Sequence, residues 1–89
     1  MLARIPLLLE PQPEGGYTVT SPLLQELITE GDTVAECLAH AEDAFAAVTE
    51  IYAHWNRPMP SSIYFDDSAG PLLIEAVVPF PESEEGLPA

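Results

Sequence analysis

Three carboxylates stand on segments with a strand-like pattern, and carboxylates on adjacent strands can hold the metal ions of a two-metal nuclease. They are Glu10, Glu26 and Glu75. No Asp or Glu pair stands at a spacing typical of such a motif, and the predicted inward face of the helix is apolar. We therefore interpret the three as solvated strand carboxylates, and a carboxylate-metal nuclease is the least favoured function.

A second possible site uses sulfur and nitrogen ligands. Cys37 and His40 are close enough on a helix to share a metal ion, but His54 lies about 21 Å further along the helix axis. Zinc normally needs four convergent ligands, or three and a water molecule. No glycine-rich phosphate loop, serine elbow or Gly-x-Cys turn is present. The sequence therefore predicts no metal, no cofactor and no catalytic residue, and thus a protein that is not an enzyme.

The charge balance restricts the possible partners. The 89 residues contain 15 Asp and Glu against two Arg and no Lys, which gives a formal net charge of −13. Nucleic acids and anionic membranes are bound mainly through Lys and Arg, so both are excluded as main partners. The lone Cys37 cannot form an intrachain disulfide, and the start of the chain is unlike a signal peptide. We expect a cytoplasmic protein.

A long helix must position most of these side chains. Thr33 and Glu36 form a capping box in which the Thr33 hydroxyl accepts the Glu36 amide and the Glu36 carboxylate returns to the Thr33 amide. The pattern ends before Arg57-Pro58, because the residue before a proline avoids the helical region. About 23 helical residues are expected. A strict 4-3 spacing predicts one buried stripe: Val34, Leu38, Ala41, Phe45, Val48, Tyr52 and Trp55.

Strand patterns surround this helix. They predict strands over 3–10, 17–21, 24–29 and 72–78, with a loop over 59–70 that carries at most one brief strand near 63–65. The 72–78 strand is apolar on both faces, as expected of a strand covered on both sides. The fold class is thus α+β: a two-layer sandwich in the order β-β-β-α-β, with one long helix on one face of an antiparallel sheet. Residues 1–80 form the domain, and 81–89 an acidic disordered tail.

Two short motifs stand in a specific order before the predicted helix: Gly15-Gly16-Tyr17 and Thr29-Glu30-Gly31-Asp32-Thr33. Together with the residues around them, over roughly 7–61, they resemble the HicB-like antitoxin family. The resemblance implies a truncated ribonuclease-H-like fold and neutralisation of a small basic HicA-like, mRNA-cleaving toxin by covering its surface. Longer members carry a C-terminal DNA-binding domain. This sequence stops before one could form, which predicts no direct DNA binding.

Two surfaces are candidates for binding. Glu36, Asp43 and Glu50 repeat every seventh position on the outer helix face, and such a ridge suits a basic partner. Leu8, Leu73 and Val77 lie on the sheet face that one helix leaves uncovered, which predicts a homo-oligomer, a dimer or a tetramer. The favoured function is an acidic antitoxin-like binding protein. The alternative is an oligomeric structural or regulatory module without a toxin.

Overall fold

The computed structural model describes residues 2–66, 70–78 and 80–81. These residues contain five short strands and one long helix. The predicted tail, apart from Pro81, lies outside these residues. The order of the elements is β1 (Leu2–Arg4), β2 (Leu8–Pro11), β3 (Tyr17–Thr20), β4 (Ile28–Gly31), α1 (Val34–His54) and β5 (Tyr64–Asp66).

The main sheet is an antiparallel meander of β2, β3 and β4. A tight turn joins β2 to β3, and there Gly15 (φ 105°) and Gly16 (φ 74°) adopt the left-handed backbone that glycine tolerates best. The Gln12 amide donates to the Gly16 carbonyl at 3.0 Å, which closes the turn. In the next pair Tyr17 faces Gly31. The turn and the start of the helix therefore lie at the same end of the sheet.

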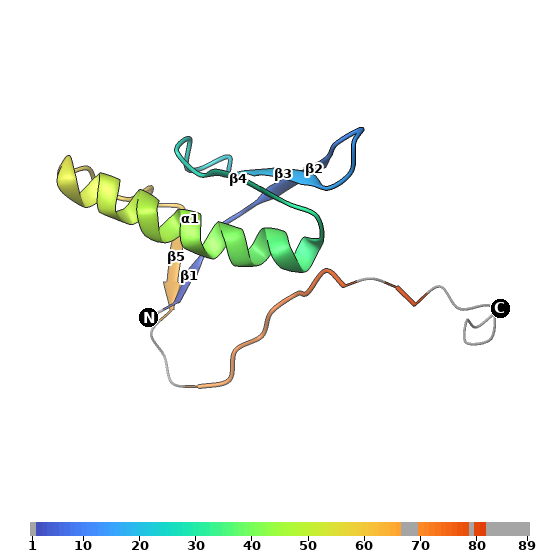
Figure 1. Cartoon of the computed structure of the whole chain (residues 1–89). Helices are drawn as coiled ribbons and strands as arrows, with labels where there is room; N and C mark the ends of the chain where they lie inside the picture. Colours follow the sequence, from blue (N-terminus) through green and yellow to red (C-terminus); the bar gives the residue numbers. More distant parts are fainter. Residues whose placement is uncertain (1, 67–69, 79, 82–89) are drawn as a thin grey trace.

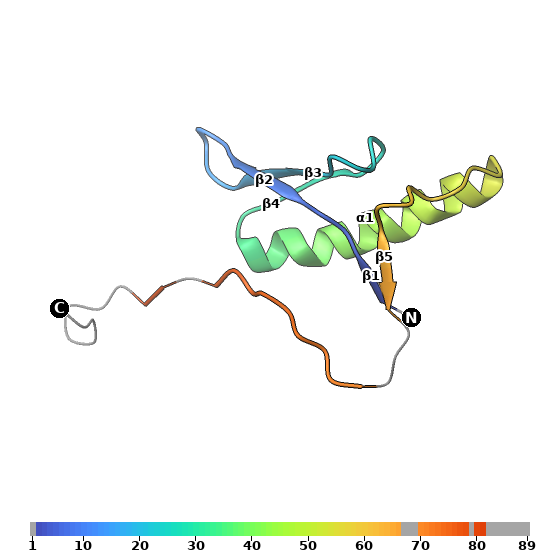
Figure 2. The ribbon, with the colours of Figure 1, turned by 180° about the vertical axis from the view of Figure 1, so that it is seen from behind.

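The helix α1 packs on one face of this sheet, and Figures 1 and 2 show the two layers from opposite sides. This is the predicted α+β arrangement of one helix on one face of an antiparallel sheet. A core of almost fully buried side chains joins the layers. It consists of Val19, Leu24, Leu27, Cys37, Ala41, Val48, Tyr52 and Ile63.

The prediction of one continuous strand over residues 3–10 is wrong. It is divided into β1 and β2 on either side of residues 5–7, and the two strands belong to different sheets. Pro6 has no amide hydrogen for a ladder hydrogen bond, which explains the interruption. The strand β1 pairs antiparallel with β5, so that Ala3 faces Phe65. The brief strand expected near 63–65 is therefore present as β5, one residue later.

The predicted third strand, 24–29, is also displaced. The strand β4 begins at Ile28, while Leu24 and Leu27 form a turn in which the Leu27 amide donates to the Leu24 carbonyl at 3.1 Å. Both leucine side chains are fully buried. A spacing of three fits a buried turn, whereas a strand alternates every two residues.

The helix ends about two residues earlier than predicted, at His54. Trp55 is the C-cap, and Asn56 adopts φ 53°. The Arg57 amide donates to the Tyr52 carbonyl at 2.8 Å and the Asn56 amide to the Ala53 carbonyl at 3.1 Å, the pair of hydrogen bonds that closes a Schellman motif. This motif therefore ends the helix before the restriction that Pro58 places on the backbone of Arg57 applies.

The buried stripe is rotated from its predicted position. Ala41, Val48 and Tyr52 are buried as expected, but Cys37 takes the place assigned to Leu38, which is 48% exposed. Trp55 lies beyond the helix and is 68% exposed, so the prediction that its ring is in the core is wrong. Its ring makes an edge contact with His54, with the centroids 5.2 Å apart.

The largest difference concerns residues 72–78, which form no strand. They run as an extended segment below α1 in Figures 1 and 2, whereas the three-stranded sheet lies above the helix. All seven are exposed. The prediction of a strand covered on both sides is therefore wrong for this chain alone.

Candidate functional site

The start of α1 is held by two side chains. Thr33 is the N-cap, and its Oγ1 accepts the Glu36 amide at 3.1 Å. The Glu36 carboxylate accepts the amide of Asp32 at 3.3 Å, not the predicted amide of Thr33. The carboxylate thus accepts an amide one residue earlier than predicted. It still caps the helix, because that amide has no partner within the helix. This hydrogen bond also holds the Glu36 carboxylate near Asp32.

Gly31 and Cys37 are packed directly against each other at this end. A Cβ on Gly31 would lie 2.8 Å from the Cys37 amide nitrogen and 2.9 Å from its Sγ. Cys37 is fully buried. Burial raises the pKa of the Cys37 thiol, and the negative charges of Glu36 and Asp32 raise it further. The thiol is therefore neither a reactive nucleophile nor an accessible metal ligand.

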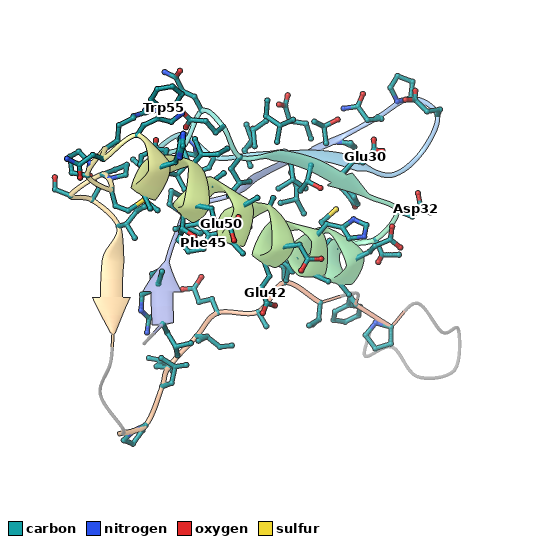
Figure 3. The ribbon with its side chains drawn as sticks, turned by 60° about the vertical axis from the view of Figure 1, so that its left-hand side comes forward. Glu30, Asp32, Glu42, Phe45, Glu50 and Trp55 are labelled. Carbon is teal, nitrogen blue, oxygen red and sulfur yellow. The ribbon has the colours of Figure 1, made fainter. Side chains whose placement is uncertain are left out.

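An acidic hollow lies between the β2–β3 turn and the start of α1. Four of its lining residues are acids: Glu14, Glu30, Asp32 and Glu36. Figure 3 labels Glu30 and Asp32 beside the first turns of the helix. His40 also lines the hollow, and its Nδ1 donates to the Glu30 carbonyl, because a carbonyl oxygen can only accept. The imidazole is thus bound to the backbone of β4.

Three of these acids were not among the predicted site residues. Glu14, Glu30 and Asp32 come from different segments, and the Tyr17–Gly31 register brings those segments together. The signal was present in the sequence: the Gly-Gly turn and the residues before the helix are the two ends of one antiparallel pair.

The predicted ridge of Glu36, Asp43 and Glu50 is exposed along α1. Seven residues make nearly two helical turns, so the three lie close to one face. Glu36 belongs both to the ridge and to the acidic hollow. Together they form what we call the acidic face: Glu14, Glu30, Asp32, Glu36, Asp43 and Glu50. In a chain with two Arg and no Lys, this surface can attract cations and repel phosphates.

The three carboxylates considered as metal ligands are not brought together as one site, and of the three only Glu10 lies in a strand. Glu26 accepts the Tyr52 hydroxyl and the Arg57 guanidinium, each at 3.0 Å, and the guanidinium lies 4.3 Å above the Tyr52 ring. The backbone amide of Glu26, Arg57 and Tyr52 hold the pKa of this carboxyl below its usual range. Among the described residues, no group of three His, Cys, Asp or Glu side chains is arranged to hold a metal ion. Glu26 thus has a structural role.

The predicted oligomer residues are all exposed, but of the three only Val77 lines the apolar groove described next. Leu8, Leu73 and Val77 are 53%, 88% and 73% exposed. Val77 lines an apolar groove between residues 74–77 and the β1–β2 region, whereas Leu8 does not. Leu7 and Leu9 line the groove instead, because neighbouring side chains in an extended chain point to opposite faces.

The chain is similar to known proteins over most of its length. It is 39% identical over 66 residues to "Antitoxin HicB" of Escherichia coli strain K12 and to that of strain O157:H7, matching 72% of this chain and 48% of each relative. It is also 39% identical over 77 residues to "Antitoxin HicB 1" of Photorhabdus laumondii, matching 84% of this chain and 50% of the relative. The chain spans about half the length of these relatives. No protein-family model matches it.

Proposed function

Because the chain belongs to the HicB-like antitoxin family, we propose that it neutralises a small basic HicA-like toxin by covering the toxin's RNA-binding surface. The similarity to proteins named Antitoxin HicB is the observation that carries this proposal. The relatives are about twice as long as the matched region, so the partner is part of the proposal. In this role the protein acts as a cytoplasmic binding protein and not as an enzyme. No helix among the described residues is long and apolar enough to span a membrane.

In this proposal the acidic face binds the basic surface of the toxin. A protein that cleaves RNA must bind phosphates, and it does so with Lys and Arg side chains. Carboxylates placed opposite those cations compete with RNA for the same charges, and they also accelerate the encounter. The formal charge of −13 supports such a role, and the exposed positions of Glu36, Asp43 and Glu50 make them available to a partner. Salt weakens this attraction because it screens exposed charges over about 8–10 Å.

The test compares two variants with the same net charge. In the ridge variant, Glu36→Gln, Asp43→Asn and Glu50→Gln together change the formal charge from −13 to about −10. In the matched control, Glu10→Gln, Glu42→Gln and Glu75→Gln make the same change at exposed positions outside the acidic face. Each protein is mixed with a purified small basic HicA-like protein. Association rates are measured by stopped flow from low to high salt.

We expect the ridge variant to associate several-fold more slowly at low salt, and the control to differ little from the unchanged chain. The Glu36→Gln change keeps a hydrogen-bond acceptor at the helix cap, so the fold should persist. Equal rates for the two variants would mean that net charge alone guides the encounter and that the ridge is not the docking surface. Failure of the unchanged chain to bind the basic protein would favour the module without a toxin.

A further inference from the structure

The second half of α1 carries an apolar row that begins at an acid of the ridge. Asp43, Ala47, Ile51 and Trp55 follow at every fourth position, and residues four apart are neighbours on a helix surface. The Trp55 amide still donates to the Ile51 carbonyl at 3.1 Å, so this spacing holds as far as the C-cap. All four residues are exposed. Ala47, Ile51 and Trp55 therefore form an open apolar surface, which we call the helix-end patch.

Trp55 dominates this patch. It is the one Trp of the chain, and 68% of its surface is exposed. An aromatic side chain buries about 150–250 Å² in a core or an interface, so roughly 150 Å² of this indole is open to a partner. Trp is also among the residue types most enriched at the few positions that hold protein interfaces together. The ring therefore contributes little to its own core and has a large surface for binding.

The charges near the helix-end patch favour a basic partner. The row begins at the exposed carboxylate of Asp43, and the exposed Glu50 lies beside it; Figure 3 labels Glu50 along α1 and Trp55 at its end. The Arg57 guanidinium is engaged elsewhere, because it donates to Glu26 at 3.0 Å and lies 4.3 Å above the Tyr52 ring. The chain itself thus holds one guanidinium over an aromatic ring with a carboxylate beside it.

We propose that the helix-end patch is the anchor of the toxin interface, with an Arg or Lys side chain of the toxin lying over the Trp55 indole. The carboxylates of Asp43 and Glu50 then pair with neighbouring cations of the same basic surface. Among aromatic rings, that of Trp attracts a cation most strongly. This inference rests on the proposed function, since it names the contact by which the chain holds the basic toxin.

An aromatic ring beside carboxylates matches what an RNA-binding surface recognises. Such surfaces bind phosphates with Lys and Arg, and they stack unpaired bases on aromatic rings or on the planes of Arg side chains. Carboxylates can take the places of phosphates, and an indole can take the place of a base. The two parts also affect different rates. Exposed charges mainly accelerate the encounter, whereas burial of an anchor side chain mainly slows dissociation.

The first measurement compares three variants of the full chain in binding a purified small basic HicA-like protein. Trp55→Ala should weaken binding at least about 30-fold, mainly through faster dissociation, which is the loss expected at an anchor residue. Trp55→Phe keeps an aromatic ring and should lose only several-fold. Ile28→Ala is the matched control, because Ile28 is 67% exposed and lies on β4; its binding should change less than about twofold. If the unchanged chain binds and Trp55→Ala binds equally well, the inference is wrong while the proposed function stands.

The second measurement leaves every residue in place. A chain made with fluorotryptophan carries one fluorine probe, at Trp55, because it contains one Trp. Fluorine NMR with a soluble paramagnetic quencher should show an exposed ring in the free chain and a protected ring after the unlabelled toxin is added. A ring that stays exposed in the complex would overturn the inference, as would protection that develops when the chain alone is concentrated, since a second copy would then cover it. If the unchanged chain does not bind the toxin, the proposed function and the inference both fail.

Discussion

The contact between Gly31 and Cys37 gives a prediction whose magnitude follows from the structure. A Cβ on Gly31 would lie 2.8 Å from the Cys37 amide nitrogen, 2.9 Å from its Sγ and 3.1 Å from its Cα. Two of these three atoms belong to the helix backbone. Gly31 itself is the last residue of β4 and pairs with Tyr17. Relief of the clash therefore requires the strand and the helix to separate.

Gly31→Ala should accordingly cost about 3 kcal/mol, the upper part of the usual range for over-packing. Gly15→Ala is the matched control for backbone strain. Gly15 has φ 105° and nothing within 4 Å of the added carbon, so we expect only the conformational cost of about 1–2 kcal/mol. Cys37→Ala in the Gly31→Ala background removes the Sγ contact but leaves both backbone contacts. It should restore only a small part of the loss.

The assay is urea unfolding followed by far-UV circular dichroism, which reports on α1, at several protein concentrations so that self-association is separated from folding. A loss of 3 kcal/mol lowers the midpoint by roughly 1–3 M urea for a domain of this size. A Gly31→Ala variant within about 0.5 kcal/mol of the unchanged chain would refute the steric argument. Full rescue by Cys37→Ala would mean that the thiol alone, and not the backbone, sets the packing distance.

Three further predictions concern single side chains. Cys37 should react with a thiol reagent only after urea unfolding, since burial and nearby carboxylates raise its pKa; rapid reaction of the folded chain would contradict this. The folded-state pKa of Glu26 is lowered by the backbone amide, Arg57 and Tyr52, so its stabilising contribution is present above the ordinary pKa and is lost as pH falls through the lower folded pKa. Glu26→Gln should remove that part of the acid dependence of the urea midpoint. An unchanged pH profile would show that these three contacts together do not stabilise the carboxylate. Trp55→Ala should cost about 1–2 kcal/mol and not the 3–5 of a buried ring, whereas Leu24→Ala should cost about 2–5; equal losses would show that the Trp55 ring is buried in solution.

The features that sequence predicts best here depend on few neighbouring residues. The cap at Thr33 and the turn at Gly15-Gly16 require hydrogen bonds and dihedral angles that span only four or five positions. The long helix and the strand predicted at 17–21 follow from periodicity in the same way. The Glu36 carboxylate accepts the Asp32 amide and not the predicted Thr33 amide, because the two neighbouring donors are both within its reach.

The face of a helix is harder to assign when two apolar stripes overlap. Ala41, Val48 and Tyr52 belong to both possible stripes, and the choice between Cys37 and Leu38 rotates the start of the helix by about 100°. The large Leu38 side chain favoured the wrong stripe. The small Cys37 fits against Gly31, a contact that depends on a strand-to-helix distance. The prediction for Trp55 was wrong for another reason. Asn56 adopts a left-handed backbone that ends the helix, and a 4-3 spacing of apolar residues contains no information about such a residue.

Salt should act in opposite directions on the two kinds of association predicted for this chain. Each copy carries a formal charge of −13, so copies repel one another, and added salt should strengthen any association between them by screening that repulsion. The same screening should slow the capture of a basic partner, because it weakens the attraction of the acidic face. Light scattering on the purified chain and stopped flow with the basic partner measure the two effects. An association between copies that weakens as salt rises would contradict the charge argument.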